Sequence, residues 1–163
     1  MRDRGAAPRI LFVCMGNICR SPTVEAIARA EFARAGIQAE VDSAGTEDYH
    51  VGEPPDPRSI RAGAAHGYDL SALRARQVVA ADFERFDLLL AMDRVNLSAL
   101  QRLRDPVGGV VPTLFLGDRD LPDPYYGTAA DFERVIELAR VGIEALMGRL
   151  RAWNAPSEKR GSP

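Results

Sequence analysis

Residues 9–22 read RILFVCMGNICRSP, and this stretch decides the fold. The apolar run 9–13 is rich in branched and aromatic residues, which predicts a strand buried on both faces of a sheet. Gly16-Asn17 favours a turn, and Ser21-Pro22 predicts the N-cap and first residue of a helix. The stretch therefore predicts a strand, a loop and a helix, with Cys14 at the point where the strand ends.

The same alternation of strand and helix continues along the chain, which favours an α/β fold with a parallel sheet between helices. Binding sites in such sheets lie at the carboxyl ends of the strands, so Cys14 occupies a candidate position. The expected elements after Pro22 are a helix to Gly36, a strand over Ala39–Ser43, a loop over Gly45–Pro57, a helix to about Gly67, a strand over Phe86–Met92, a helix over Val95–Leu103, a strand over Val110–Leu116 and a helix over Thr128–Ala152.

Length and composition set limits on the function. The 163 residues, 46% of them apolar, fit one globular domain over residues 1–153, and residues 154–163 have the composition of a disordered tail. The net charge of −2 gives no overall positive field for nucleic acid or an anionic membrane. We expect an anionic substrate to need a local site.

No stretch of the sequence has the length of a signal peptide's apolar region or of a membrane span. The chain is therefore expected to be a cytoplasmic protein without membrane insertion. Its two cysteines are too few for a disulfide framework, and their spacing of five residues indicates chemistry.

The loop after the first strand carries a thiol, Cys14, and a guanidinium, Arg20. Such a loop can turn its N–H groups inward around a tetrahedral anion, and the helix start adds further donors. The same field favours a thiolate at Cys14, while the planar fork of Arg20 matches two phosphate oxygens. Ser21 can donate its hydroxyl to the Cys14 sulfur. The alternatives are a buried structural cysteine and a surface arginine.

A nucleophile that displaces an alkoxide or phenolate also needs a proton donor. Asp123 lies between two prolines, which restrict the backbone and would hold the carboxylate in place. Tyr125 and Tyr126 follow and offer aromatic surface. Taken alone, this segment would be an ordinary Asp-Pro turn.

These residues together resemble the low-molecular-weight protein tyrosine phosphatase family from about Ile10 to Leu150. The family carries a Cys-x-x-Gly-Asn-x-Cys-Arg-Ser-Pro loop and an Asp-Pro-Tyr-Tyr-Gly element, matched here by residues 14–22 and 123–127. The likeness continues in Ser43-Ala44-Gly45-Thr46, Val51-Gly52, Asp56-Pro57-Arg58, Ala75-Arg76-Gln77, Asp82-Phe83 and Met92-Asp93.

The resemblance implies a four-stranded parallel sheet flanked by helices, with the phosphate-binding loop after the first strand. It implies hydrolysis of phosphotyrosine through a phosphocysteine intermediate, without metal or organic cofactor. Cys14 would be the nucleophile, Arg20 the phosphate clamp and Asp123 the general acid and base. The remaining expected site residues are Met15, Gly16, Asn17, Ile18, Cys19 and Ser21 in the loop, Ser43 as support for Asn17, and Tyr49 and Tyr125 as walls of a deep slot.

Three positions stay open within this resemblance. Leu73 stands where the family commonly has a His that helps to fix the loop Asn, and His66 is a poor substitute candidate because a lone His is more often structural. Cys19 would form a reversible disulfide with Cys14 under peroxide, or else is a buried packing residue. Without the family, Tyr49 would be an exposed loop aromatic.

Other functions use the same scaffold. Arsenate reduction generally needs a further resolving cysteine, which this chain lacks. The branch that acts on phosphoarginine is associated with Thr where this chain has Ile18. A non-catalytic phosphotyrosine-binding module would keep the loop and lose Cys14 or Asp123. We therefore expect a phosphotyrosine-containing protein as the substrate, such as a bacterial tyrosine kinase or a protein that such a kinase phosphorylates.

Overall fold

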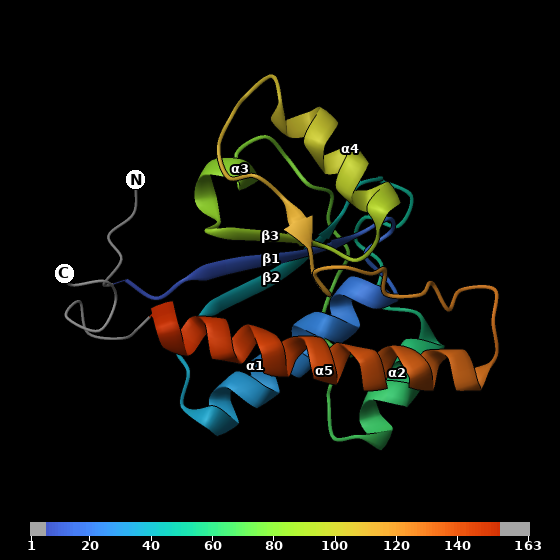
Figure 1. Ribbon diagram of the computed structural model, residues 1–163. Helices are drawn as coiled ribbons and strands as arrows, with labels where there is room; N and C mark the ends of the chain where they lie inside the picture. The colour runs from blue at the N-terminus through green and yellow to red at the C-terminus, as the bar shows by residue number, and fades with distance from the viewer. Residues whose placement is uncertain (1–5, 154–163) are drawn as a thin grey trace.

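A single sheet of four parallel strands runs through the molecule, in the order β2-β1-β3-β4. The computed structural model describes residues 6–153, and Figure 1 shows helices on both faces of the sheet. The elements are β1 (Arg9–Cys14), α1 (Arg20–Ala35), β2 (Glu40–Gly45), α2 (Pro57–Ala65), α3 (Asp82–Arg85), β3 (Leu88–Ala91), α4 (Arg94–Arg104), β4 (Thr113–Leu114) and α5 (Ala129–Trp153). The α/β fold expected from the sequence is confirmed.

Strand β1 lies inside the sheet and pairs with β2 on one side and β3 on the other. The chain leaves β1 toward one neighbour and later enters the other, so the carboxyl end of β1 is a point where the strand order reverses. Ligands in open α/β sheets bind at such points. Cys14 is the last residue of β1 and pairs there with Gly45.

Two apolar clusters cover the two faces of the sheet. The larger joins Ile10 and Phe12 of β1 to α1 and α5, and the smaller joins Leu11 and Val13 to Phe83 and the helices on the other side. Because β1 alternates its side chains between the faces, all four of these residues are fully buried. The carboxyl end of β1 is therefore held from both sides.

Several element boundaries differ from the sequence prediction. Ser21 is not the N-cap of α1, because the helix begins at Arg20 with Cys19 at the N-cap. The last strand is only Thr113–Leu114. Pro112 has no N–H to give the sheet, and the N–H of Val110 bonds to Phe83 O instead of a strand.

The remaining elements lie close to their expected places. Strand β2 extends to Gly45 because its last residues still pair with β1, and the short helix α3 was not predicted. Helix α1 ends as expected at Gly36, whose φ of 70° is left-handed. The tail predicted over residues 154–163 lies outside the described residues.

Candidate active site

The loop between β1 and α1 is fastened to the segment that follows β2. The N–H groups of Thr46 and Glu47 donate to Cys14 O and Met15 O at 2.9 and 3.0 Å. A Cβ on Gly45 would lie 2.6 Å from Met15 O, so only glycine allows this approach. Backbone hydrogen bonds from Thr46 and Glu47 thus hold the start of the loop in place.

The sulfur of Cys14 lies at the bottom of this loop and is buried. Ser21 Oγ is 3.0 Å from Cys14 Sγ, and the N–H of Asn17 donates to the sulfur at 3.3 Å. The N-terminal turn of α1 starts six residues after Cys14 along the chain. Hydrogen-bond donors and the positive end of a helix stabilise a thiolate over a thiol.

Asn17 fixes the shape of the loop through its side chain. It is the single non-glycine residue with positive φ, at 58°, among residues 6–153. Its Nδ2 donates to Ser21 Oγ at 2.8 Å and to Ser43 Oγ at 2.9 Å. Its Oδ1 accepts from the N–H of Arg76 at 3.0 Å. All hydrogen-bonding atoms of the amide are therefore used to hold the strained residue.

Arg20 is the other charged group at the bottom of the site. Its Nη1 donates to Asp93 Oδ2 at 2.7 Å and to Leu121 O at 2.9 Å. Burial alone would lower the pKa of Arg20, but the charge of Cys14 and the hydrogen bond to Asp93 outweigh it, and the pKa is raised. The guanidinium thus stays charged in a buried place with its plane fixed.

Asp123 approaches this pair from the loop between β4 and α5. Its Oδ2 is 3.7 Å from Arg20 Nη2, and its side chain is 49% exposed. Its Oδ1 accepts from the N–H of Tyr125 at 3.1 Å. Arg58 of α2 donates to Tyr125 O at 3.0 Å, and its guanidinium lies 5.4 Å from the centre of the tyrosine ring. Arg58 thus holds the loop that carries Asp123 against α2.

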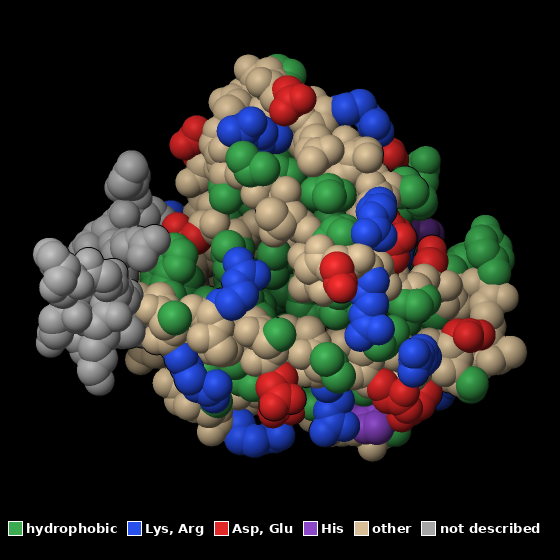
Figure 2. Space-filling model, in the orientation of Figure 1, with side chains coloured by type: hydrophobic (Ala, Val, Ile, Leu, Met, Phe, Trp, Pro, Cys, Tyr) green, Lys and Arg blue, Asp and Glu red, His purple; other side chains and the backbone are tan. Residues whose placement is uncertain are grey.

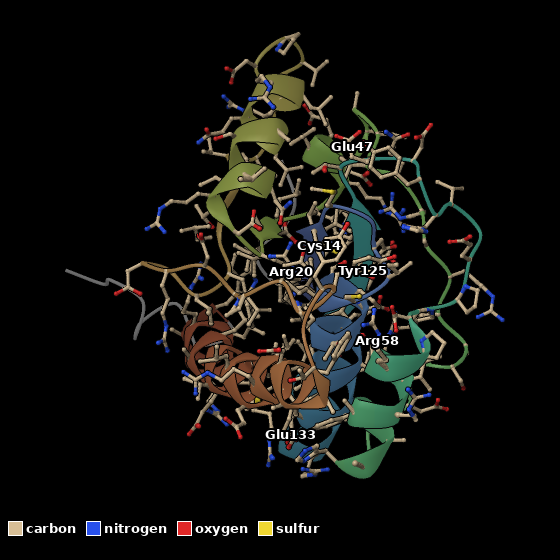
Figure 3. All side chains as sticks on the ribbon, turned by 90° about the vertical axis from the view of Figure 1, so that its right-hand side faces the viewer. Cys14, Arg20, Glu47, Arg58, Tyr125 and Glu133 are labelled. Carbon is tan, nitrogen blue, oxygen red and sulfur yellow. The ribbon has the colours of Figure 1, made fainter. Side chains whose placement is uncertain are left out.

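Figure 3 shows Cys14, Arg20 and Tyr125 on neighbouring segments near the first turn of α1, with Arg58 on the adjacent helix. Cys14, Arg20 and Tyr125 border a cavity of about 360 Å³. Its lining contains most of the expected site residues together with two residues that were not expected in the site, His50 and Tyr126. The expected residues in the lining are Cys14, Met15, Gly16, Ile18, Cys19, Arg20, Tyr49, Asp123 and Tyr125.

The three other expected residues, Asn17, Ser21 and Ser43, are buried behind the loop and bonded to one another through Asn17. Leu73, in the place of the family's His, is partly buried and packs against the larger apolar cluster. His66 bonds to Glu133 of α5 and does not line the cavity.

Cys19 differs from Cys14 although both are buried free thiols. Burial raises the pKa of Cys19 to about 12, and its hydrogen bond to Ser59 opposes that shift without cancelling it. The carboxylates of Asp56 and Asp123 add to the rise. Cys19 is thus a neutral thiol at physiological pH.

Sequence reasoning missed two carboxylates that support the site. Asp93 holds Arg20 and also accepts from the N–H of Asn96, as the N-cap of α4. Glu25 of α1, 2% exposed, accepts from Ser43 Oγ at 2.6 Å. The position of Asp93 directly after a buried apolar strand could have indicated it. Glu25 has no such signal, because its partner is 18 residues away along the chain.

Residues 6–153 offer neither a metal site nor a membrane span. This part of the chain has no group of three or more His, Cys, Asp or Glu side chains placed to hold a metal ion. None of its helices is long and apolar enough to cross a membrane. On the face that α5 covers, Figure 2 shows acidic and basic side chains interspersed, in agreement with the small net charge.

Comparison with known proteins agrees with this geometry. The family described as low molecular weight phosphotyrosine protein phosphatase matches residues 9–155. The low molecular weight protein-tyrosine-phosphatase of Streptomyces coelicolor is 42% identical over 154 residues, 88% of this chain and 93% of the relative. The human low molecular weight phosphotyrosine protein phosphatase is 40% identical over 141 residues, 81% of this chain and 89% of the relative.

The solved structures give the same result. The crystal structure of YfkJ from Bacillus subtilis matches with a TM-score of 0.83 at 35% identity, over 91% of this chain and 98% of that protein. The resemblance noted from the residues 14–22 and 123–127 is thereby confirmed over nearly the whole chain. This protein belongs to the low molecular weight phosphotyrosine protein phosphatase family.

Proposed function

We propose that this protein removes phosphate from phosphotyrosine in proteins, with Cys14 as nucleophile, Arg20 as phosphate clamp and Asp123 as general acid and base. The observation that carries the proposal is the setting of the Cys14 sulfur. It accepts a hydrogen bond from the N–H of Asn17 and lies 3.0 Å from Ser21 Oγ, at the bottom of a cavity that Arg20 and Asp123 also line. Nucleophile, anion-binding group and proton donor thus face one space, as a phosphoryl transfer requires.

In the first step the Cys14 thiolate attacks phosphorus, so that an S–P bond forms and the P–O bond to the tyrosine breaks. Asp123 gives its proton to the departing phenolate oxygen. The fork of Arg20 and the loop N–H groups bind the three phosphoryl oxygens as they spread in the transition state. Asp93 and Leu121 O keep that fork in the required plane.

In the second step water attacks the phosphocysteine, and Asp123, now a carboxylate, accepts the proton of that water. The S–P bond breaks and its electron pair returns to sulfur. Ser21, 3.0 Å from the sulfur, stabilises the thiolate as it leaves. The products are inorganic phosphate and an enzyme ready for another cycle.

The aromatic residues of the cavity support tyrosine as the substrate. Tyr49 and Tyr125 line the entrance, while Cys14 at the bottom is 3% exposed. A phosphotyrosine ring can fill the space between them, whereas phosphoserine is shorter and would leave its phosphate above the sulfur. Ile18 beside the cavity adds apolar surface and is the residue that argues against phosphoarginine.

The partner and location follow from the same chemistry. We propose that the substrate is a phosphotyrosine protein such as a bacterial tyrosine kinase or its target. A compartment that keeps thiols reduced, such as the cytoplasm, suits an enzyme whose two cysteines are both free. Because the net charge of the protein is −2, an anionic substrate has to be attracted by the positive groups of the site itself.

A substrate panel tests the proposal. Initial rates on phosphotyrosine, phosphoserine and phosphoarginine peptides and on arsenate with a thiol reductant should rank phosphotyrosine first. Faster turnover of phosphoarginine or arsenate would transfer the assignment to the corresponding alternative. Binding of the phosphotyrosine peptide without turnover of any substrate would favour a non-catalytic binding module.

A further inference from the structure

The hydrogen bond between Ser21 Oγ and Cys14 Sγ, 3.0 Å long, could run in either direction. If Ser21 donates, the bond stabilises a thiolate. If the sulfur donates, it has to be a neutral thiol. The proton positions deeper in the molecule decide between the two.

The first fixed point is Glu25, which is buried on α1. Arg29, one turn later, donates to its Oε2 from Nε at 2.9 Å and from Nη2 at 2.7 Å, so the two form a salt bridge. A carboxylate can only accept hydrogen bonds. Ser43 Oγ, 2.6 Å from Glu25 Oε1, therefore directs its proton toward Glu25.

The second fixed point is the backbone of Arg76. Its N–H can only donate, and it donates to Oδ1 of Asn17 at 3.0 Å. The amide nitrogen of Asn17 thus faces the other way, where it lies 2.9 Å from Ser43 Oγ and 2.8 Å from Ser21 Oγ. Each hydroxyl oxygen accepts one of its two protons.

The two fixed points agree with each other. Ser43 accepts from Asn17 and donates to Glu25, so its bonds are consistent at both ends. Ser21 accepts from Asn17, which leaves its proton free to be donated to the Cys14 sulfur, the other partner of its hydroxyl. All of these side chains are buried, and water does not compete for the protons.

We propose that Glu25 is a positioning residue that sets the direction of the chain Glu25–Ser43–Asn17–Ser21, so that Ser21 donates to the Cys14 thiolate. The proposal rests on the function of Cys14 as nucleophile given above. This series of hydrogen bonds also explains how Asn17 is held although Leu73 cannot bond to it, because Ser21, Ser43 and the N–H of Arg76 use all of its amide atoms.

The substitution Glu25→Gln tests this direction with almost no change of shape. The new amide turns its oxygen to Arg29 and its NH2 group to Ser43, and the Ser43 proton is then forced against Asn17. The through-space effect has the opposite sign, since removal of a negative charge favours the thiolate. The charged or titratable groups around the sulfur, namely Arg20, Asp93, Asp123, Cys19 and His50, stay in place.

The measurement is the pH dependence of Cys14 alkylation by iodoacetate, with kcat and KM for p-nitrophenyl phosphate. In Glu25→Gln we expect the midpoint of alkylation to rise by about one pH unit, the effect of losing one hydrogen bond to a charged group. We expect kcat to fall several-fold with little change in KM. A midpoint that stays or falls overturns the proposal.

The matched control is Glu31→Gln. Glu31 also lies on α1 and also bonds an arginine, Arg34, and a hydroxyl, that of Tyr68, but it has no link to the loop. We expect its midpoint to equal that of the unmodified protein. An equal rise in both variants would mean a general loosening of the helix and would overturn the proposal.

Ser43→Ala provides the second test and removes the dependence on one variant folding well. It removes the hydroxyl that links Glu25 to Asn17 by hydrogen bonds, so it should by itself raise the pH midpoint of Cys14 alkylation. Glu25→Gln added to it should cause no further rise, and additive shifts overturn the proposal.

If the unmodified protein neither alkylates at neutral pH nor hydrolyses phosphotyrosine, the proposed function fails. If the unmodified protein does both and the alkylation midpoint of Glu25→Gln is unshifted, only the inference about Glu25 is overturned.

Discussion

The cavity has a floor and a rim that are built in opposite ways. The floor, taken together with the residues buried directly behind it, consists of Cys14, Asn17, Arg20 and Ser21, which are at most 3% exposed. The rim consists of residues that are 38 to 95% exposed, Met15, Tyr49, Tyr125 and Tyr126.

Their polar contacts differ as much as their exposure. Every floor residue takes part in a side-chain hydrogen bond to another buried group. The rim rings of Tyr125 and Tyr126 mainly pack against each other, with their centres 4.9 Å apart and their planes nearly perpendicular. We infer from this contrast that the buried floor carries the chemistry and that the exposed rim selects the substrate. Substitutions in the floor should therefore reduce turnover, and substitutions in the rim should change affinity.

The largest effect is expected at the nucleophile. Cys14→Ser replaces the sulfur by a hydroxyl that is not ionised at neutral pH, so kcat should fall by on the order of 10⁴-fold or more. Steady-state hydrolysis of p-nitrophenyl phosphate measures the loss. Vanadate should still bind, because the rest of the floor is intact. Activity comparable to that of the unmodified protein would show that another group attacks phosphorus.

The clamp should give the next largest effect. Arg20→Lys keeps the charge but loses the planar fork and the paired bonds to Asp93 and Leu121 O, so kcat/KM should fall by about 10²- to 10³-fold. The control Arg94→Lys changes an exposed arginine that is paired with Asp120 and should leave kcat/KM unchanged. Equal effects of the two substitutions would remove the clamp role of Arg20.

The proton donor should give an effect that depends on the leaving group. Asp123→Ala should lower kcat by about 10²-fold on phosphotyrosine, and by less on p-nitrophenyl phosphate, whose phenolate leaves without a proton. Asp120→Ala, in the same loop, is the matched control. A plot of rate against leaving-group pKa should be steeper for Asp123→Ala than for the control, and parallel lines would contradict the role.

The smallest effect is expected at the rim. Tyr49→Ala removes a wall of the entrance that is 67% exposed, so KM for a phosphotyrosine peptide should rise about three- to tenfold while kcat changes little. Tyr49→Phe should retain the original KM, because the ring and not the hydroxyl supplies the contact. A fall in kcat as large as that of Asp123→Ala would show that Tyr49 takes part in the chemical step and not only in substrate binding.

The sequence predicted the floor better than its supports. Cys14, Arg20 and the helix after them are local in the chain, and a strand, a turn and a helix start are readable from neighbouring residues. The distant Asp123 could be found because prolines mark its loop. Asp93 and Glu25 were missed, because each acts through a contact that only the folded sheet creates, 73 and 18 residues away along the chain.

Some local predictions also failed for physical reasons. Ser21 has the residue type of an N-cap, but its hydroxyl is used by Asn17 and Cys14 inside the first turn of α1. The strand expected over Val110–Leu116 is only Thr113–Leu114, because Pro112 has no N–H for the sheet and the N–H of Val110 bonds to Phe83 O. Leu73 left open what replaces the family's His, and in the structure Ser43 and the N–H of Arg76 hold the loop Asn.

The central claim is that the floor holds the Cys14 sulfur as a thiolate beneath a bound phosphoryl group. Iodoacetate at neutral pH, followed by mass spectrometry, tests it directly and uses Cys19, whose pKa burial raises to about 12, as the internal reference. The account predicts one adduct, on Cys14, that vanadate or inorganic phosphate prevents. Absence of that adduct at neutral pH, or alkylation of Cys14 that neither anion slows, would contradict it.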